Sequence, residues 1–175
     1  MTKQVAVLAV NPVNGFGLFQ YLETFFEKGI SYKVFAVSDT KNILTNSKIP
    51  LQADDTVVNL KGHADEYDAL IFACGDAVPV YQNHADKTYN QNMLAVIKEF
   101  AGKNKILAGH CAAALIFEIA GVTEGCKLSI HPLAKPAIQK GIATGKEEMV
   151  EGNIYTEQSE HTISVLMPEL LDALK

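Results

Sequence analysis

The sequence predicts a three-layer α/β/α domain in which helices cover both faces of a doubly wound, mostly parallel sheet. Short apolar runs alternate with longer segments whose apolar residues recur at helical spacing, and this alternation is typical of a parallel sheet built from β-α-β units. The length of 175 residues suits one domain. No repeat or linker divides the chain, so residues 1–175 are expected to form a single domain.

Four apolar runs are expected to form the central strands of this sheet. The first, Val5–Val10, is apolar throughout, as expected for a strand with helices on both of its faces. Three later runs have the same character: Tyr32–Val37, Asp68–Ala73 and Lys105–Gly109. Weaker strand-like segments follow at residues 127–130 and 153–156. Residues 38–66 mix polar turns with isolated apolar residues and are expected to contain loops or short strands.

Helices are predicted between and after these strands. Apolar residues recur at helical spacing after the first strand until Gly29 stops the pattern. The same periodicity predicts helices over three later segments, residues 86–101, 112–120 and 163–174. In the last of these, Pro168 either kinks the helix or marks its true start.

The composition favours a cytoplasmic protein that binds neither nucleic acid nor a membrane. The net charge is −5 and no cluster of basic residues is present, so a polyanionic partner is not expected. The apolar run Val5–Val10 is too short for a membrane span. Three widely spaced cysteines form neither a disulfide framework nor a set of close zinc ligands, so we expect free thiols and no metal.

The most informative segment is the junction between a strand and a helix at Cys111. The strand ends at Gly109 and the helix begins directly after the cysteine, which leaves one or two residues for the turn. Gly109, Ala112 and Ala113 supply the small neighbours that such a strained turn requires, in a G-x-C-x-A pattern related to the nucleophile elbow. The first N–H groups of a helix favour a thiolate over a thiol. A buried cysteine that only packs is the alternative.

Several further segments carry a resemblance to a known family. They are the strand and turn Tyr67–Gly75, the Ala120-Gly121-Val122 segment and the late stretch Glu151–Thr156. The most specific is His131-Pro132-Leu133-Ala134-Lys135, which begins 20 residues after Cys111. Together with the elbow, these segments resemble the ThiJ/PfpI superfamily of intracellular cysteine proteases or amidases and deglycases. The resemblance implies a flavodoxin-like, Rossmann-like fold of the class I glutamine amidotransferase type, and a homodimer.

The chain departs from the pattern of this family at its acidic residues. Members commonly carry a carboxylate after the first strand, where this chain has Asn14-Gly15-Phe16-Gly17-Leu18. The protease branch has a glutamate after its Pro-Gly-Gly turn, where this chain has Asp76, and a histidine directly after the cysteine, where it has Ala112. A histidine precedes the cysteine instead, at His110. The sequence alone does not identify the residue that replaces the missing acid.

Two histidines and one carboxylate are candidate partners of Cys111. His131 is the candidate base, or the cation that keeps the thiol ionised, with a surface or capping role as the alternative. His110 is a second catalytic candidate, or else a core histidine bonded to the backbone. Asp76 is the nearest carboxylate, on the turn after the third core strand. It is a candidate replacement for the acidic residue that other family members carry, with a structural role in the turn as the alternative.

Backbone groups and a second thiol complete the predicted site. The N–H groups near Gly75 and Ala112 are candidates for an oxyanion hole. Cys74 ends a strand that we expect beside the strand of Cys111, so it is a candidate redox partner, with packing as the alternative. Cys126 follows a turn without a charged cluster, and no reactivity is predicted for it.

Two functions remain open at this point. One is a cysteine-dependent hydrolase of the protease or amidase type that acts on a small carbonyl or amide substrate, with Cys111 as nucleophile. The other is a redox-sensing stress protein, non-catalytic or glyoxalase- or deglycase-like, that uses the same thiol. No cofactor is expected, because Asn11–Gly15 lacks the Ser/Thr-rich loop with which flavodoxins bind phosphate. A homodimer is expected from the resemblance and from the phenylalanine-rich first helix.

Overall fold

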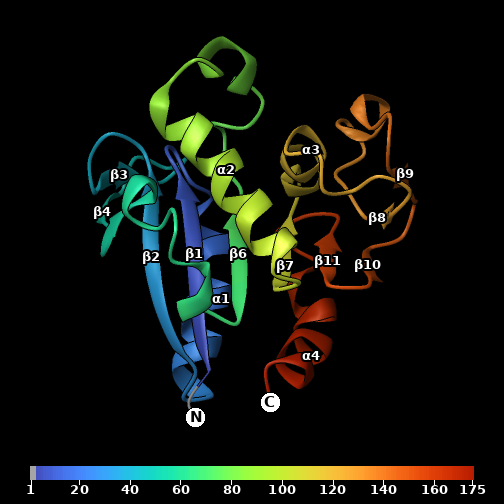
Figure 1. The fold of residues 1–175 in the computed structure, drawn as a ribbon, viewed down its shortest axis with the longest axis horizontal. Helices are drawn as coiled ribbons and strands as arrows, with labels where there is room; N and C mark the ends of the chain where they lie inside the picture. Colours follow the sequence, from blue (N-terminus) through green and yellow to red (C-terminus); the bar gives the residue numbers. More distant parts are fainter. Residues whose placement is uncertain (1–2) are drawn as a thin grey trace.

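A seven-stranded sheet forms the middle layer of the computed structural model, which describes residues 3–175 (Figure 1). Its order is β10-β11-β7-β6-β1-β2-β5, and only β10 runs antiparallel to its neighbour. The bounds of the strands in chain order are β1 (Gln4–Val10), β2 (Ser31–Val37), β5 (Asp55–Thr56), β6 (Ala69–Ala73), β7 (Ile106–His110), β10 (Glu148–Glu151) and β11 (Ile154–Glu157).

The order of the five main strands confirms the doubly wound sheet that the sequence predicts. The chain runs from β1 outward to β2, returns across β1 to β6, and continues through β7 to β11, which is the flavodoxin-like arrangement. Every residue of β6, and all of β1 after Gln4, is buried, because helices cover both faces of these strands. The carboxyl ends of β1, β6, β7 and β11 therefore meet at one edge of the sheet.

Four helices form the two outer layers. Helices α1 (Gly15–Glu27) and α4 (Ile163–Ala173) contact each other on one face, and α2 (Thr88–Gly102) and α3 (Ala113–Ile119) contact each other on the other. Pro168 lies inside α4, five residues after its first residue, so the prediction that it marks the start of the helix was wrong. None of the helices within residues 3–175 is long and apolar enough to span a bilayer.

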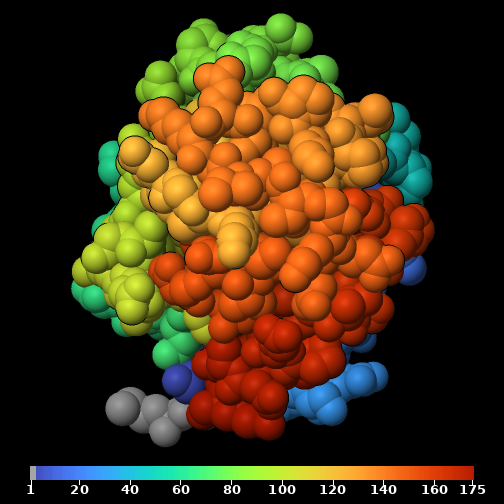
Figure 2. All heavy atoms as spheres, turned by 90° about the vertical axis from the view of Figure 1, so that its right-hand side faces the viewer, coloured from blue at the N-terminus to red at the C-terminus, as the bar shows by residue number. Residues whose placement is uncertain are grey.

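The segments with weak sequence patterns form small additional elements. Residues 38–66 contain the hairpin of β3 (Asn42–Leu44) and β4 (Pro50–Gln52), the edge strand β5, and the 3₁₀ helices η1 (Val57–Asn59) and η2 (Ala64–Glu66). The strand predicted at residues 127–130 is shorter, because β8 (Lys127–Leu128) pairs only with β9 (Ile142–Ala143). Figure 2 shows that residues 127–150 and α4 cover one side of the molecule. Two further 3₁₀ helices are η3 (Tyr81–His84) and η4 (Lys135–Ala137).

Candidate functional site

Cys111 lies between β7 and α3 in the strained conformation that the sequence predicts. Its φ angle is +59°, in the left-handed region that residues other than glycine rarely adopt. A Cβ atom at Gly109 would meet the Cβ of Ala113 at 2.6 Å, so the sharp turn requires both a glycine before the cysteine and a small residue after it. These contacts confirm the elbow at Cys111.

A polar pocket of about 220 Å³ opens beside the sulfur of Cys111. It lies at the carboxyl edge of the sheet, where doubly wound folds place their ligands. Its walls contain all seven residues that the sequence proposes for the site, and four others that it does not. The polar pocket is lined by Asn14, Asn46, Cys74, Gly75, Asp76, Pro79, His110, Cys111, Ala112, His131 and Glu160.

The elements that meet at this edge explain why these residues come together. In the pairing of β6 with β7, Phe72 lies opposite Gly109. Cys74 is two residues after Phe72 and Cys111 is two residues after Gly109, so the two cysteines follow equivalent positions of neighbouring strands. The loop after β1 is held against the end of β6, because the Asn14 N–H donates to the Cys74 carbonyl over 2.9 Å. A Cβ atom at Gly75 would meet Pro12 O at 2.3 Å. Glycine at position 75 therefore permits the close approach of the two loops.

His131 is connected to Cys111 through the backbone. Its N–H donates to the Cys111 carbonyl oxygen over 3.0 Å, and its side chain lines the polar pocket. The Nδ1 atom of the imidazole accepts a hydrogen bond from the Leu133 N–H over 3.3 Å, so the proton of the neutral ring resides on Nε2.

The Cys74 thiol makes the largest contribution to the pKa of Cys111, and it lowers that pKa below the ordinary value. The Ala112 backbone N–H lowers it as well, whereas partial burial and the carboxylates of Glu160 and Asp76 act in the opposite direction. Cys74 is buried, and its own pKa is raised well above the ordinary value, chiefly by its interaction with Cys111 and by burial. The sequence analysis proposed His131 and the first N–H groups of the helix as the groups that favour the thiolate; Cys74 makes the largest contribution instead, and His131 is not among the groups that shift this pKa.

We expect Cys74→Ala to raise the pKa of Cys111, because the substitution removes the neighbour that lowers this pKa most. The rate of Cys111 alkylation by iodoacetamide, followed by mass spectrometry across a pH series, measures that pKa. Cys126→Ala is the matched control, because Cys126 lines none of the pockets near Cys111. An unchanged alkylation profile in Cys74→Ala would contradict the assignment.

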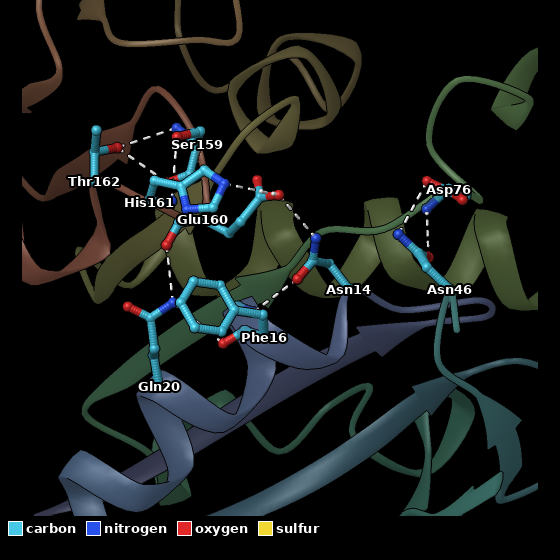
Figure 3. Close-up of polar contacts among 10 residues, drawn as sticks. Asn14, Phe16, Gln20, Asn46, Asp76, Ser159, Glu160, His161 and Thr162 are labelled. Atoms are coloured by element: carbon cyan, nitrogen blue, oxygen red, sulfur yellow. Dashed lines mark hydrogen bonds and ion pairs between the residues drawn. The ribbon is translucent and has the colours of Figure 1, made fainter. Parts of the chain in front are cut away.

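Glu160 is the carboxylate that the sequence analysis does not find. It follows β11 by three residues, and its Oε1 accepts a hydrogen bond from the Asn14 side-chain amide over 3.2 Å (Figure 3). The Gln20 side-chain amide donates to the Glu160 carbonyl oxygen over 2.8 Å. These two contacts, both from the start of α1, hold Glu160 in the wall of the polar pocket. An acid is therefore present, but it comes from the opposite end of the chain.

Asp76 also lines the polar pocket, but its hydrogen bonds are to Asn46 and not to Asn14 or α1. Its Oδ1 accepts from the Asn46 side-chain amide over 3.0 Å, and its N–H donates to Asn46 Oδ1 over 3.1 Å (Figure 3). The carboxylate is thus committed to joining the turn after β6 to the loop between β3 and β4, in keeping with the turn role weighed from the sequence. Its charge still reaches Cys111, whose pKa it raises.

His110 lies behind the turn in a buried polar cluster with Tyr21 and Glu157. Its ring packs against Tyr21, with centroids 5.8 Å apart, and Gly17 leaves room for it on α1. The Tyr21 hydroxyl donates to Glu157 Oε2 over 2.6 Å. Among the described residues, neither ring nitrogen of His110 has a hydrogen-bond partner, nor does Glu157 Oε1. Burial lowers the pKa of His110 to about 4, so the ring is neutral near pH 7.

Glu157→Gln is expected to change how stability depends on pH. Burial raises the pKa of Glu157 to about 8, from 4.5, so above pH 4.5 unfolding releases the proton of this carboxyl. Between pH 4.5 and 6.5, His110 offsets this effect by taking up a proton on unfolding. Between pH 6.5 and about 8, Glu157 should contribute a fall in the free energy of unfolding of about 1.4 kcal/mol per pH unit, while the lowered pKa of Cys111 acts in the opposite direction in both the wild type and the variants.

Urea unfolding from pH 6.5 to pH 8 measures this effect. Glutamine keeps an oxygen for the Tyr21 hydroxyl but has no proton to lose, so the decline should be absent in Glu157→Gln. Glu27→Gln, at an exposed position on α1, is the control and should retain the wild-type decline. A decline of equal size in both variants would contradict a buried, protonated Glu157.

Comparisons with known proteins agree with this arrangement. The sequence model of the DJ-1/PfpI family matches residues 3–173. Protein ppBat of Bacteroides thetaiotaomicron is 60% identical over 175 residues, which is the whole of both chains. The crystal structure of the "putative protease I" from the same species has a TM-score of 0.98 at 60% identity and covers 99% of this chain and 100% of that one.

A more distant structure shares the fold alone. Drosophila melanogaster DJ-1beta has a TM-score of 0.85 at 16% identity, with 99% of this chain and 91% of that chain covered. The match to the family model extends over nearly all of the chain, and the elbow and sheet order described above are those implied by the sequence resemblance. The chain belongs to the DJ-1/PfpI family.

Proposed function

We propose that this protein is a cysteine-dependent hydrolase in which Cys111 attacks the carbonyl carbon of a small ester or amide substrate. The observation that carries the proposal is the position of Cys111: a strained elbow presents its sulfur to a polar pocket, and the Cys74 thiol and the Ala112 N–H lower its pKa. A thiolate held in this way is a ready nucleophile. The Bacteroides thetaiotaomicron structure is described as a "putative protease I", which agrees with hydrolysis.

The other pocket residues have roles that follow from their chemistry. Attack by the thiolate forms a carbon–sulfur bond and a tetrahedral oxyanion, and we assign the N–H groups of Gly75 and Ala112 to stabilising this oxyanion. The Nε2–H of His131 donates a hydrogen bond to the leaving group as the bond from that group to the carbonyl carbon breaks, and the departing group takes its proton from water. A water molecule then hydrolyses the thioester and restores the thiolate. Glu160 is the acid that we assign to holding this water.

A substrate panel tests the proposal. Small aryl esters, small amides and methylglyoxal are incubated with wild-type protein, and with Cys126→Ser as a control that retains Cys111. We expect turnover of at least one ester or amide by both proteins, and loss of that turnover after alkylation of Cys111 with iodoacetamide. Absence of Cys111-dependent turnover across the panel would overturn the hydrolase proposal. Turnover of methylglyoxal alone would replace it with glyoxalase chemistry.

Redox sensing is the second candidate function, and the neighbouring position of Cys74 favours it. Both thiols line the polar pocket. Hydrogen peroxide would oxidise the Cys111 thiolate to a sulfenic acid with release of hydroxide, and the Cys74 thiol would condense with it to form a disulfide and water. Mass spectrometry after peroxide treatment should detect a Cys74–Cys111 disulfide in the wild type and over-oxidised Cys111 in Cys74→Ala. Exclusive oxidation of Cys126 would contradict this candidate.

We also propose that the protein acts as a cytoplasmic homodimer. Helix α1 exposes three phenylalanine side chains, Phe16, Phe19 and Phe26, with exposed fractions of 60%, 42% and 74%. Large apolar side chains gathered on one exposed helix are typical of a surface that another protein covers. Light scattering should give twice the chain mass of 19.0 kDa. A mass of one chain over a wide concentration range would contradict the dimer.

A further inference from the structure

An apolar cavity of about 440 Å³ also borders Cys111, next to the polar pocket. Four residues line both spaces, namely Pro79, Cys111, Ala112 and His131. The cavity, here called the apolar pocket, is about twice the volume of the polar pocket. A molecule whose reacting atom lies at the Cys111 sulfur therefore has more room on the apolar side than on the polar side.

The walls of the apolar pocket come from three parts of the fold. Leu115 and Ile119 lie one turn apart on α3, both only half-buried, and Tyr81 contributes from η3. Ala134 contributes from the segment that follows His131. Within the described part of the chain, no Asp, Glu, Lys or Arg side chain lines this cavity, and apart from Cys111 its polar side chains are those of Tyr81, Gln82 and His131. The cavity therefore favours burial of an aliphatic or aromatic group over that of a charged one.

We infer that the apolar pocket is an acyl-binding subsite, so that the preferred substrate carries a hydrophobic acyl group on the carbonyl that Cys111 attacks. This inference rests on the proposed hydrolase function and adds the class of substrate. The acyl group would lie along Leu115 and Ile119 on α3, while the leaving group would point into the polar pocket. The carboxylates of Asp76 and Glu160, which line the polar pocket, disfavour a substrate whose leaving group already carries a negatively charged substituent.

Hydrolysis of such an ester needs only the Cys111 thiolate and water, and no cofactor. The Cys111 thiolate forms a bond to the carbonyl carbon, and the bond from that carbon to the leaving oxygen breaks and releases an alcohol or phenol. Water then attacks the acyl thioester, which releases the carboxylic acid and returns the thiol. The acyl chain stays in the apolar pocket through both steps, so its burial stabilises both transition states.

A series of p-nitrophenyl esters tests the inference. Acetate, butyrate and hexanoate differ in acyl length alone, and nitrophenolate release gives kcat/KM for each. Each buried methylene should raise kcat/KM about fourfold, which corresponds to about 0.8 kcal/mol. Hexanoate has four more methylenes than acetate, so we expect its kcat/KM to exceed that of acetate by about 250-fold, after correction for the rates of the uncatalysed reactions.

Substitutions in the pocket show where this preference arises. Ala134→Phe fills the cavity and should lower the hexanoate-to-acetate ratio at least about tenfold. Leu115→Gln, at a half-buried position, should lower the ratio as well and serves if Ala134→Phe does not fold. Val165→Phe, at an exposed position on α4 that lines neither pocket, is the control and should keep the wild-type ratio.

The outcomes separate the subsite from the hydrolase itself. Equal kcat/KM for the three esters, with release that still depends on Cys111, would overturn the acyl subsite and leave the proposed function standing. Absence of Cys111-dependent release from every ester would overturn the proposed function. If Ala134→Phe halves the mass measured by light scattering and leaves the ratio unchanged, the cavity belongs to an interface between two copies, and the inference is wrong.

Discussion

Cys111→Ser is expected to lower ester or amide turnover by about 10³-fold or more while the fold is retained. A serine hydroxyl at this position would remain protonated, because the Cys74 thiol and the Ala112 N–H act on a group whose ordinary pKa is far higher than that of a thiol. The change replaces one sulfur atom by oxygen in a partly exposed position, so packing changes little.

Steady-state kinetics with the best substrate of the panel measure this loss, and urea unfolding confirms the fold. Cys126→Ser is the matched control, because it makes the same exchange of atoms at a half-buried thiol away from the pocket. Cys111→Ser with more than about a tenth of wild-type turnover would remove the thiol from the mechanism.

Gly75→Ala is expected to destabilise the protein by about 3 kcal/mol and to disrupt the site at the same time. The added methyl group would meet the backbone of the loop after β1 at three atoms, Pro12 O at 2.3 Å, Val13 Cα at 2.6 Å and Asn14 N at 2.8 Å. Backbone atoms cannot turn aside as a flexible side chain can. Separation of the loops would break the bond from the Asn14 N–H to Cys74 and move the amide that holds Glu160.

The comparison with Gly102→Ala isolates this effect. A Cβ atom at Gly102, the last residue of α2, would meet nothing within 4 Å, so alanine there should be neutral or stabilising by less than about 1 kcal/mol. The midpoints of urea unfolding of the two variants give the difference. Equal midpoints would show that the loop after β1 yields to the extra methyl group, contrary to the close packing described here.

The central strands and the elbow could be predicted because their signals are local. The first core strand was predicted at residues 5–10 and begins one residue earlier in the structure. At the elbow, the small residues that the turn requires, Gly109, Ala112 and Ala113, are all within two residues of Cys111 in the sequence. Pro168 was ambiguous because two local signals disagreed: apolar periodicity starts the helix at residue 163, whereas a proline is also common in the first turn of a helix, and the structure has α4 begin at Ile163, five residues before the proline.

The acid of the site could not be predicted from any local pattern. Glu160 and its partner Asn14 are 146 residues apart in sequence, and they meet because β11 pairs with β7 and α1 packs against α4. The one available signal was positional, since Glu160 follows the carboxyl end of a predicted strand by a few residues.

The central claim, that Cys111 is the nucleophile at the junction of a polar and an apolar pocket, is tested most directly by trapping its acyl intermediate. Wild-type protein is mixed with p-nitrophenyl hexanoate, quenched in acid within the first turnover, digested and mapped by mass spectrometry. A hexanoyl group on the peptide that contains Cys111, absent when Cys111→Ser is treated in the same way, is the result that we expect. Nitrophenolate release with the hexanoyl group on Cys126 or a lysine, and none on Cys111, would contradict the account.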